Sequence, residues 1–355
     1  MTGGLWQFPK AALRHANQGV QDNRDMHIVI SHAAAPGPRC RAASATLQLP
    51  HLQALLQRVA AQTLHAGRQE SLTPLAEHVA SGQAYGDGLV PWAAWLALAS
   101  ALYEGGQHWA LISPCHLQIH SDHVAMQDPG LLQLDEEESR MLLAAMRPYF
   151  EEDGIALHWH SASTWLAQGI VFQDLASASL ARVRGQPIDS WIPRQSAAQG
   201  LRRLQNEMQM LLYTHALNDA RSARGQAPVN GFWISGTGSP LGDNVSPNLA
   251  ASPLQALLAK GGANSASISP HALYIDALSS SALGDDPEAW IQAWQTLDAQ
   301  VFAPLAAQQA SGPEISISLC GEQRARTWVP GRASLWQRIK QHLAAPRFHH
   351  FVQDL

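Results

Sequence analysis

Charge is scarce in this sequence. Of its 355 residues only 14% are charged and 46% are hydrophobic, and the formal net charge is −5. A chain so rich in apolar residues can bury a core and is not disordered. It also lacks the clusters of Lys and Arg that a nucleic-acid surface requires. We therefore expect a globular protein without a nucleic-acid partner.

Cysteines and long apolar runs are scarce as well. The three cysteines, Cys40, Cys115 and Cys320, are odd in number and form no CxxC pair, which is typical of a reducing compartment without a disulfide framework. No apolar run follows Lys10 and Arg14, and residues 18–25 are mostly polar, so this part of the sequence does not resemble a signal peptide. No window approaches the roughly 20 apolar residues that span a bilayer. The sequence thus predicts a cytoplasmic protein with no membrane partner.

Strand and helix patterns alternate along the chain. Strands are expected at residues 26–30, 108–112, 155–160, 229–234, 272–276 and 314–319. Helices are expected at residues 49–59, 92–102, 135–147, 201–224, 253–260, 285–305 and 334–343. This alternation indicates the α/β class with a mostly parallel sheet, and the length allows two domains. The β-α-β group at 104–190 is interpreted as a smaller lobe.

The stretch 201–240 has the strongest local signals. Leu201 and Leu204 begin the apolar face of a helix, and a short strand then leads into a Gly/Ser turn. Ligands bind at loops that leave the carboxyl ends of strands in open α/β sheets, and guanidinium groups suit anions. We therefore predict a ligand site made of Arg221, Arg224, Asn230, Ser235, Gly236 and Gly238. The alternative is that the arginines pair with Asp219 or Glu207 and that the turn is structural.

A second group of ligand-type residues follows Cys115. His116, His120, Asp122 and His123 would bind a metal ion if the His-x-x-x-His spacing lay on a helix. Since Pro114 opens the segment and no helix signal follows, we expect no metal there. The preferred interpretation is a loop in which His116 and His123 contact the ligand.

Ser31 and His32 are the candidate catalytic residues. They are polar side chains directly after the first strand, where an α/β sheet places its site. A Ser/His hydrolase would also need an Asp and a G-x-S-x-G turn, which the sequence does not show.

Three phrases carry a family resemblance. THALNDARSARGQAPVNGFWISGTGSP is similar to the pattern N-x-x-R … N-x-x-W-x-x-G-x-G-x-x-P, and its matching residues are Asn218, Arg221, Asn230, Trp233, Gly236, Gly238 and Pro240. The first strand with LPHLQALL, and the acidic helix start at 135–139, resemble other segments in the same order. The chain thus resembles the archaeal type of cofactor-independent phosphoglycerate mutase, in the alkaline phosphatase superfamily.

The resemblance implies a domain arrangement and a chemistry. It implies a three-layer alkaline-phosphatase-like core at 26–103 and 191–345, an inserted α+β lobe at 104–190, and irregular tails at 1–25 and 346–355. It also implies a Ser or Thr nucleophile beside two divalent metal ions, which Asp and His ligands hold.

The metal-ligand positions of that family are changed in this chain. Ser31-His32 stands where an Asp-Gly turn normally follows the first strand. Asp276 lacks the His that normally follows it, and Gly321-Glu322 stands in place of Asp-His after the last strand. Because two divalent cations need several carboxylate and imidazole ligands, we predict that the two-metal site is lost.

The predicted function is therefore a mutase-like protein that binds a phosphorylated or carboxylated small molecule in a regulatory or binding role, without a cofactor. One alternative is an active phosphoglycerate mutase or phosphatase with a Mn or Zn site rebuilt from His32, Asp276, Asp285, Asp286 and Glu322. Another is a scaffold whose Trp-rich surface binds a protein partner. The sequence leaves open whether the protein is an enzyme.

Overall fold

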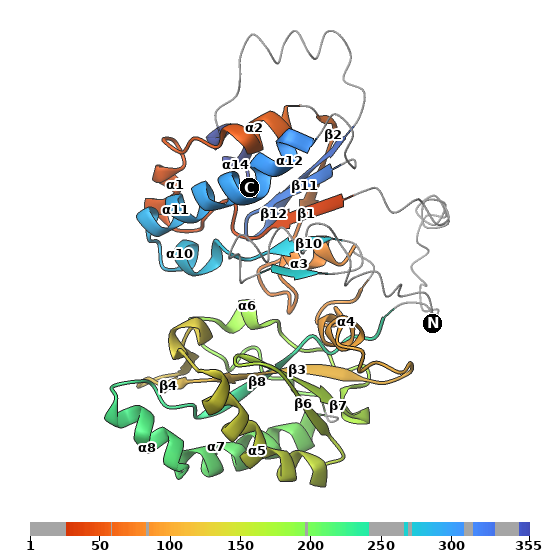
Figure 1. Ribbon diagram of the computed structural model, residues 1–355, viewed down its shortest axis with the longest axis vertical. Coiled ribbons are helices and arrows are strands. Elements are labelled where there is room, and N and C mark those ends of the chain that lie inside the picture. The colour runs from red at the N-terminus through yellow and green to blue at the C-terminus, as the bar shows by residue number, and fades with distance from the viewer. Residues whose placement is uncertain are drawn as a thin grey trace, which may run out of the picture.

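The computed structural model describes residues 26–57, 59–82, 85–195, 198–240, 266–268, 272–308, 315–330 and 348–355. They form two units, each built around its own sheet, with the shorter helices α3, α4 and α6 between them (Figure 1). The helices expected at 253–260 and 334–343, and the expected tail 1–25, lie outside the described residues. Among the described helices, none combines the length and the apolar character that crossing a membrane requires.

The first unit contains a six-stranded sheet in the order β2-β12-β11-β1-β10-β9. Its strands are β1 (Met26–Ile30), β2 (Val59–Ala66), β9 (Ala266–Ile268), β10 (Leu273–Ile275), β11 (Ile315–Cys320) and β12 (Arg324–Pro330). The central strand β1 is parallel to β10 and β11, whereas the three outer pairings are antiparallel. The short connection from β11 to β12 allows only an antiparallel pair. The expected parallel arrangement therefore holds for the centre of the sheet.

Helices cover both faces of this sheet. One face carries α1 (Pro38–Ala43), α2 (Pro50–Leu56), α10 (Ser279–Leu283), α11 (Pro287–Leu297), a π-helical turn (Asp298–Phe302), α12 (Ala303–Gln308) and α14 (His349–Val352). The other face carries α3 (Leu75–Ala80). Successive side chains of β1 alternate between the two cores, since Ile28 and Ile30 pack on one side and Val29 on the other.

Local signals account for the helix starts of this unit. Asp286 caps α11 by accepting hydrogen bonds from the backbone N–H groups of Glu288 and Ala289, and Pro287 occupies the first turn. Neither β2 nor α3 was predicted: β2 has no regular alternation of apolar and polar residues, and α3 lies in a stretch that is mostly polar and contains several glycines. The tail expected at 346–355 contains the short helix α14, whose Phe351 and Val352 are buried.

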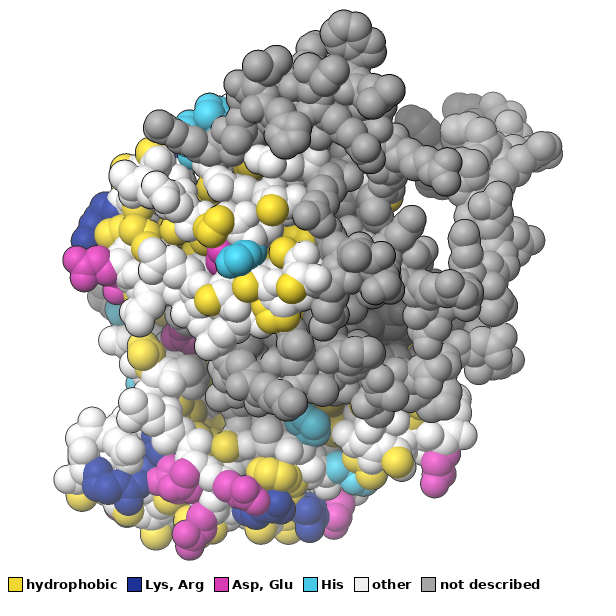
Figure 2. All heavy atoms as spheres, turned by 45° about the horizontal axis from the view of Figure 1, so that its top comes forward, with side chains coloured by type: hydrophobic (Ala, Val, Ile, Leu, Met, Phe, Trp, Pro, Cys, Tyr) yellow, Lys and Arg dark blue, Asp and Glu magenta, His cyan; other side chains and the backbone are white. Residues whose placement is uncertain are grey.

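The second unit contains a four-stranded antiparallel sheet in the order β6-β7-β3-β8. Its strands are β3 (Trp109–Cys115), β6 (Ala156–Ser161), β7 (Thr164–Gln168) and β8 (Gly231–Ser235), and β4 (Leu117–Ile119) and β5 (Val124–Met126) form a separate hairpin. Its helices are α4 (Trp92–Ala99), α5 (Glu136–Glu152), α6 (Leu180–Val183), α7 (Gln199–Tyr213) and α8 (Ala216–Ala223). Figure 2 shows basic and acidic side chains interleaved over this unit, without a broad face of one sign among the coloured residues of that view.

Helix α5 starts as the sequence predicts but ends later. Asp135 accepts a hydrogen bond from the backbone N–H of Glu138, and three acidic residues fill the first turn. The expected end at Pro148 is wrong, because the helix continues to Glu152. Proline removes one backbone hydrogen bond, but Phe150 beyond it is fully buried in the core of this unit.

The assignment of the stretch 201–240 to the first unit needs correction. Strand β8 pairs with β3, and Leu204 and Met208 of α7 pack into the core of the second sheet. The lobe predicted at 104–190 therefore has the wrong end, because its sheet also includes β8 at Gly231–Ser235. The argument from the carboxyl ends of parallel strands does not apply to the loop after β8, because every pairing in its sheet is antiparallel.

Candidate functional site

A cleft of about 140 Å³ lies where the central strands of the first sheet end and face the second unit. Its walls include Ser31 and His32 after β1, Gly321 and Glu322 after β11, and Arg182 and Arg184 at α6. The carboxyl ends of parallel strands meet at one edge of a sheet, which is where open α/β proteins bind ligands. The predicted catalytic residues Ser31 and His32 are therefore in this cleft.

His32 occupies an unusual backbone conformation, with φ of 53°. Positive φ is uncommon for a residue other than glycine, and such strain clusters at functional sites. The flanking hydrogen bonds hold the turn in place, because the N–H of Ser31 donates to the carbonyl of Ile275 and that of Ala33 donates to Cys320. The indole N–H of Trp290 also donates to the carbonyl of His32, at 3.4 Å.

The imidazole of His32 lies in a polar cluster. Its Nδ1 is 2.8 Å from Ser31 Oγ, 3.1 Å from Ser279 Oγ and 3.9 Å from Asp276 Oδ1. Burial lowers the pKa of His32 and outweighs the opposing attraction of Asp276, so the ring is neutral at pH 7. The structure thus supplies the Asp that the sequence did not show.

This cluster does not have the geometry of a hydrolase triad. A general-base histidine faces its nucleophile with one ring nitrogen and its carboxylate with the other. Here the two hydroxyls and the Asp276 carboxylate all gather at Nδ1 of His32. Ser31 and His32 form a polar part of the cleft wall, and Ser279 and Asp276 contact His32 from outside the lining.

Two arginines from the second unit form the opposite wall. Arg184 is 3.3 Å from Asp276 Oδ2 and 3.7 Å from Asp128 Oδ1, so its charge is balanced. Arg182 donates to the carbonyl of Arg68 at 3.1 Å, and its Nε is buried without a hydrogen-bond partner. Among the described residues, no carboxylate lies within ion-pair distance of Arg182. Arg182 is therefore a half-buried cation whose Nε–H donor has no hydrogen-bond partner among the described residues.

The residues at the strand ends do not suit a two-metal centre. Asp276 is occupied by Arg184 and by the hydroxyl of Ser279, and Glu322 is exposed. In the part of the chain that the structure describes, no three His, Cys, Asp or Glu side chains come together as metal ligands. The neighbouring guanidinium groups would also repel a divalent cation.

The other residues proposed for a rebuilt metal site have structural partners. Asp285 accepts hydrogen bonds from the backbone N–H groups of Arg39 and Cys40 at the start of α1. Asp286 caps α11. Neither residue lines the cleft.

Arg221 and Arg224 support the fold. Arg221 is fully buried, and it donates to the carboxylate of Glu138 and to the carbonyls of Leu132 and Ala227. Arg224 donates to the same carboxylate. The arginines therefore have structural partners, as the alternative supposed, but the carboxylate is that of Glu138 of α5 and not that of Asp219 or Glu207.

The loop after β8 and Asn230 are also structural. The side chain of Asn230 bonds both the N–H and the carbonyl of Leu117, at 2.6 and 2.9 Å. Ser235, Gly236 and Gly238 are buried, and a Cβ on Gly238 would lie 1.7 Å from the carbonyl oxygen of Leu89. This close packing leaves no space for an anion.

The histidine segment lies away from the cleft. It forms the β4–β5 hairpin and not a helix, so the His-x-x-x-His spacing does not align metal ligands. His116 is 2.8 Å from the carbonyl of Pro228, whereas His123 stacks on His120 and pairs with the exposed Asp122. Neither His116 nor His123 lines the cleft.

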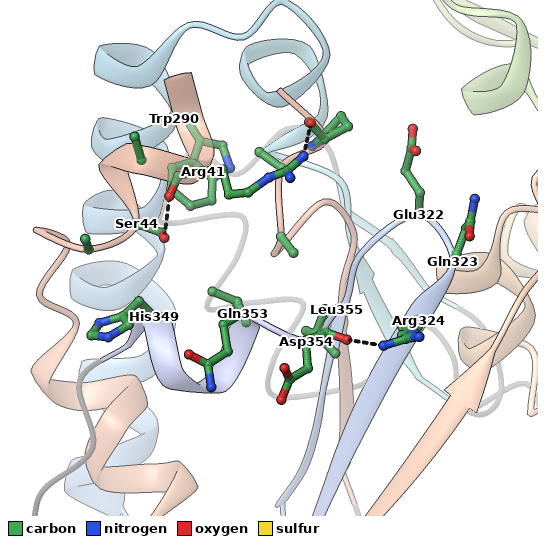
Figure 3. A pocket seen from close by; sticks show the side chains of 16 residues that line it. Arg41, Ser44, Trp290, Glu322, Gln323, Arg324, His349, Gln353, Asp354 and Leu355 are labelled. Atoms are coloured by element: carbon green, nitrogen blue, oxygen red, sulfur yellow. Dashed lines mark hydrogen bonds between the residues drawn. The ribbon is translucent and has the colours of Figure 1, made fainter. Parts of the chain in front are cut away.

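A larger hollow of about 670 Å³ is lined by residues of the loop that follows β1, of α1 and of the segment around α14 (Figure 3). Two of its arginines, like Arg182, donate to backbone carbonyls: Arg41 to Pro36 and Arg324 to Asp354. We take the smaller cleft as the candidate site because it lies at the carboxyl ends of the parallel strands and contains His32, whose φ is positive, and Arg182, whose buried Nε has no hydrogen-bond partner.

Comparison with known proteins bears on the fold alone. No family model and no curated protein matches the chain. A solved structure of a cofactor-independent phosphoglycerate mutase from Thermoplasma acidophilum DSM 1728 is similar at 12% identity and a TM-score of 0.37, over 93% of this chain and 99% of that one. The PH0037 protein from Pyrococcus horikoshii is similar at 13% identity and a TM-score of 0.48, over 94% and 97%.

Proposed function

We propose that the protein binds a small phosphorylated or carboxylated metabolite in the cleft, in a regulatory or binding role, without two-metal phosphoryl transfer. The observation that carries the proposal is Arg182, whose guanidinium lines the cleft without a carboxylate partner among the described residues. A guanidinium fork matches phosphate and carboxylate oxygens. The hydroxyl of Ser31 and the neutral His32 add hydrogen-bonding groups opposite it.

The size of the cleft restricts the ligand. About 140 Å³ is below the roughly 300–1,000 Å³ of pockets for drug-sized molecules. The cleft therefore suits one phosphate or carboxylate with a short carbon chain. A cytoplasmic location belongs to the same proposal, and the three buried free cysteines support it.

Replacement of Arg182 by methionine tests the proposal. Methionine retains much of the side-chain volume and removes the charge, so affinity for inorganic sulfate or a phosphorylated three-carbon acid is expected to fall about ten- to a hundredfold, as for loss of a charge-assisted hydrogen bond. Isothermal titration calorimetry measures the change. The matched control is Arg194→Met, since Arg194 is exposed and does not line the cleft. Equal affinity in wild type and Arg182→Met would remove Arg182 from the site.

The enzymatic alternative is tested separately. Purified protein is supplied with Mn²⁺ or Zn²⁺, and bound metal, phosphoglycerate mutase activity and phosphatase activity are measured. We expect neither stoichiometric metal nor turnover, because Asp276 is already neutralised by Arg184. Metal-dependent turnover that His32→Ala abolishes would contradict the proposal. If the protein binds a stable protein partner and Arg182→Met does not change that binding, the result would favour the alternative function of a scaffold.

A further inference from the structure

A buried carboxylate lies directly behind the floor of the cleft. Glu77 is on α3, next to Leu75 and Ala76, which line the cleft. Its exposed fraction is only 7%. Buried acids without a full counter-charge are uncommon because water no longer stabilises their ionised form.

The carboxylate of Glu77 joins the two units. The indole N–H of Trp92, on α4, donates to Oε2 at 3.1 Å, and the hydroxyl of Ser179 donates to Oε1. Ser179 is also the N-cap of α6, because its Oγ accepts a hydrogen bond from the N–H of Ala181 at 3.2 Å. One hydroxyl thus connects Glu77 to the helix that carries Arg182.

Several titratable groups face Glu77 from the surrounding elements. The pKa of Glu77 is raised to about 7, mainly by burial and also by the charge of Asp276, which follows β10. The hydrogen bonds from Ser179 and Trp92 and the charge of Arg182 of α6 act in the opposite direction. Tyr274 of β10 and Cys320 of β11 share this core. Burial raises the pKa of both the phenol and the thiol, so they remain neutral. Glu77 is therefore the group behind the cleft that changes charge near pH 7.

We infer that anion binding in the cleft is coupled to proton uptake by Glu77, so that this carboxylate makes the site sensitive to pH. The inference rests on the proposed function of the cleft. An anion beside Arg182 repels the ionised carboxylate and favours the neutral acid, and by linkage the neutral acid favours the anion. The proton comes from solvent and adds to a carboxylate oxygen of Glu77.

The hydrogen bonds around Glu77 accommodate both protonation states. In the ionised form both oxygens accept, from Trp92 and from Ser179. In the neutral form the new O–H donates to Ser179 Oγ, whose hydroxyl can accept as well as donate, and the other oxygen still accepts from Trp92. Proton uptake therefore changes the charge behind the cleft while both carboxylate oxygens of Glu77 keep a hydrogen-bond partner.

Sulfate titrations at about pH 6 and about pH 8 test the coupling, since the charge of sulfate is constant over this range. Wild type is expected to bind sulfate about three- to tenfold more tightly at the lower pH, the effect of one charge near a partly buried site. Glu77→Gln is expected to bind with similar affinity at both values. Glu322→Gln, which removes a carboxylate that lines the same cleft, is the matched control and should retain the wild-type ratio.

Calorimetry of wild type in buffers of different ionisation enthalpy measures proton uptake directly and does not depend on any variant. Net uptake of a fraction of a proton per sulfate near pH 7 supports the inference. Binding without proton uptake overturns it and leaves the proposed function intact. A pH dependence that persists in Glu77→Gln also overturns it and assigns the proton to another group, such as His32. Absence of sulfate binding at either pH refutes the proposed function itself.

Discussion

Replacement of Arg221 by methionine is expected to lower the free energy of unfolding by about 3–5 kcal/mol, the usual effect of removing one partner from a buried ion pair. The guanidinium is fully buried and contacts Glu138, which is itself 7% exposed. Arg224 also contacts this carboxylate, but Arg224 is 52% exposed, so water screens its charge. The variant therefore leaves a buried carboxylate poorly compensated.

Chemical denaturation measures this effect, and two further variants identify its cause. Arg221→Met combined with Glu138→Gln is expected to recover a large part of the loss, because no buried charge is then stranded. Arg203→Met removes an exposed ion pair with Asp153 and should change stability by less than about 1 kcal/mol. Sulfate affinity of folded Arg221→Met should equal that of wild type. A variant with wild-type stability that no longer binds the anion would restore Arg221 to the ligand site.

Glu77→Gln is expected to change how stability depends on pH. The folded pKa of about 7 lies above the ordinary value of 4.5, so the native state holds its proton more tightly than the unfolded chain. This contribution is fully present below pH 4.5 and is lost as pH rises through 7. Wild type should therefore lose up to about 3 kcal/mol relative to Glu77→Gln between about pH 4 and pH 8.

Unfolding midpoints in denaturant, measured across this pH range at constant ionic strength, give the comparison. The control is Glu137→Gln, an exposed position in the first turn of α5, whose pH profile should remain close to that of wild type. Parallel profiles for wild type and Glu77→Gln would show that Glu77 does not titrate differently in the folded protein. That result would also weaken the proton linkage inferred for the cleft.

Features that depend on neighbouring residues could be predicted from the sequence. Asp135 and Pro287 signal helix starts because such signals lie within a few residues of the helix they begin. The mostly apolar residues 26–30 indicate a strand of the core, since a strand covered on both faces is largely apolar. Ser31 and His32 could therefore be predicted as site candidates, because they are the first polar side chains after that strand.

Features that depend on distant partners could not be predicted. The segment with β2 and α3 lacks a strong hydrophobic periodicity. Strand β2 forms by pairing with β12, and α3 packs against the first sheet. Strand β8 was assigned to the wrong unit because its apolar sequence suits either sheet. Arg182 has no motif around it, since α6 spans only Leu180–Val183.

The sequence by itself determined the α/β class, the low charge and the residues that directly follow each strand, because each is a property of composition or of adjacent positions. Only the tertiary structure decided which arginines are paired inside the fold and which line the cleft. Arg221 and Arg182 have the same chemistry, and their roles differ because Glu138 packs against the first, whereas the second lines the cleft without a carboxylate among the described residues. The role of a guanidinium is set by what surrounds it, and the surroundings come from residues far apart in the chain.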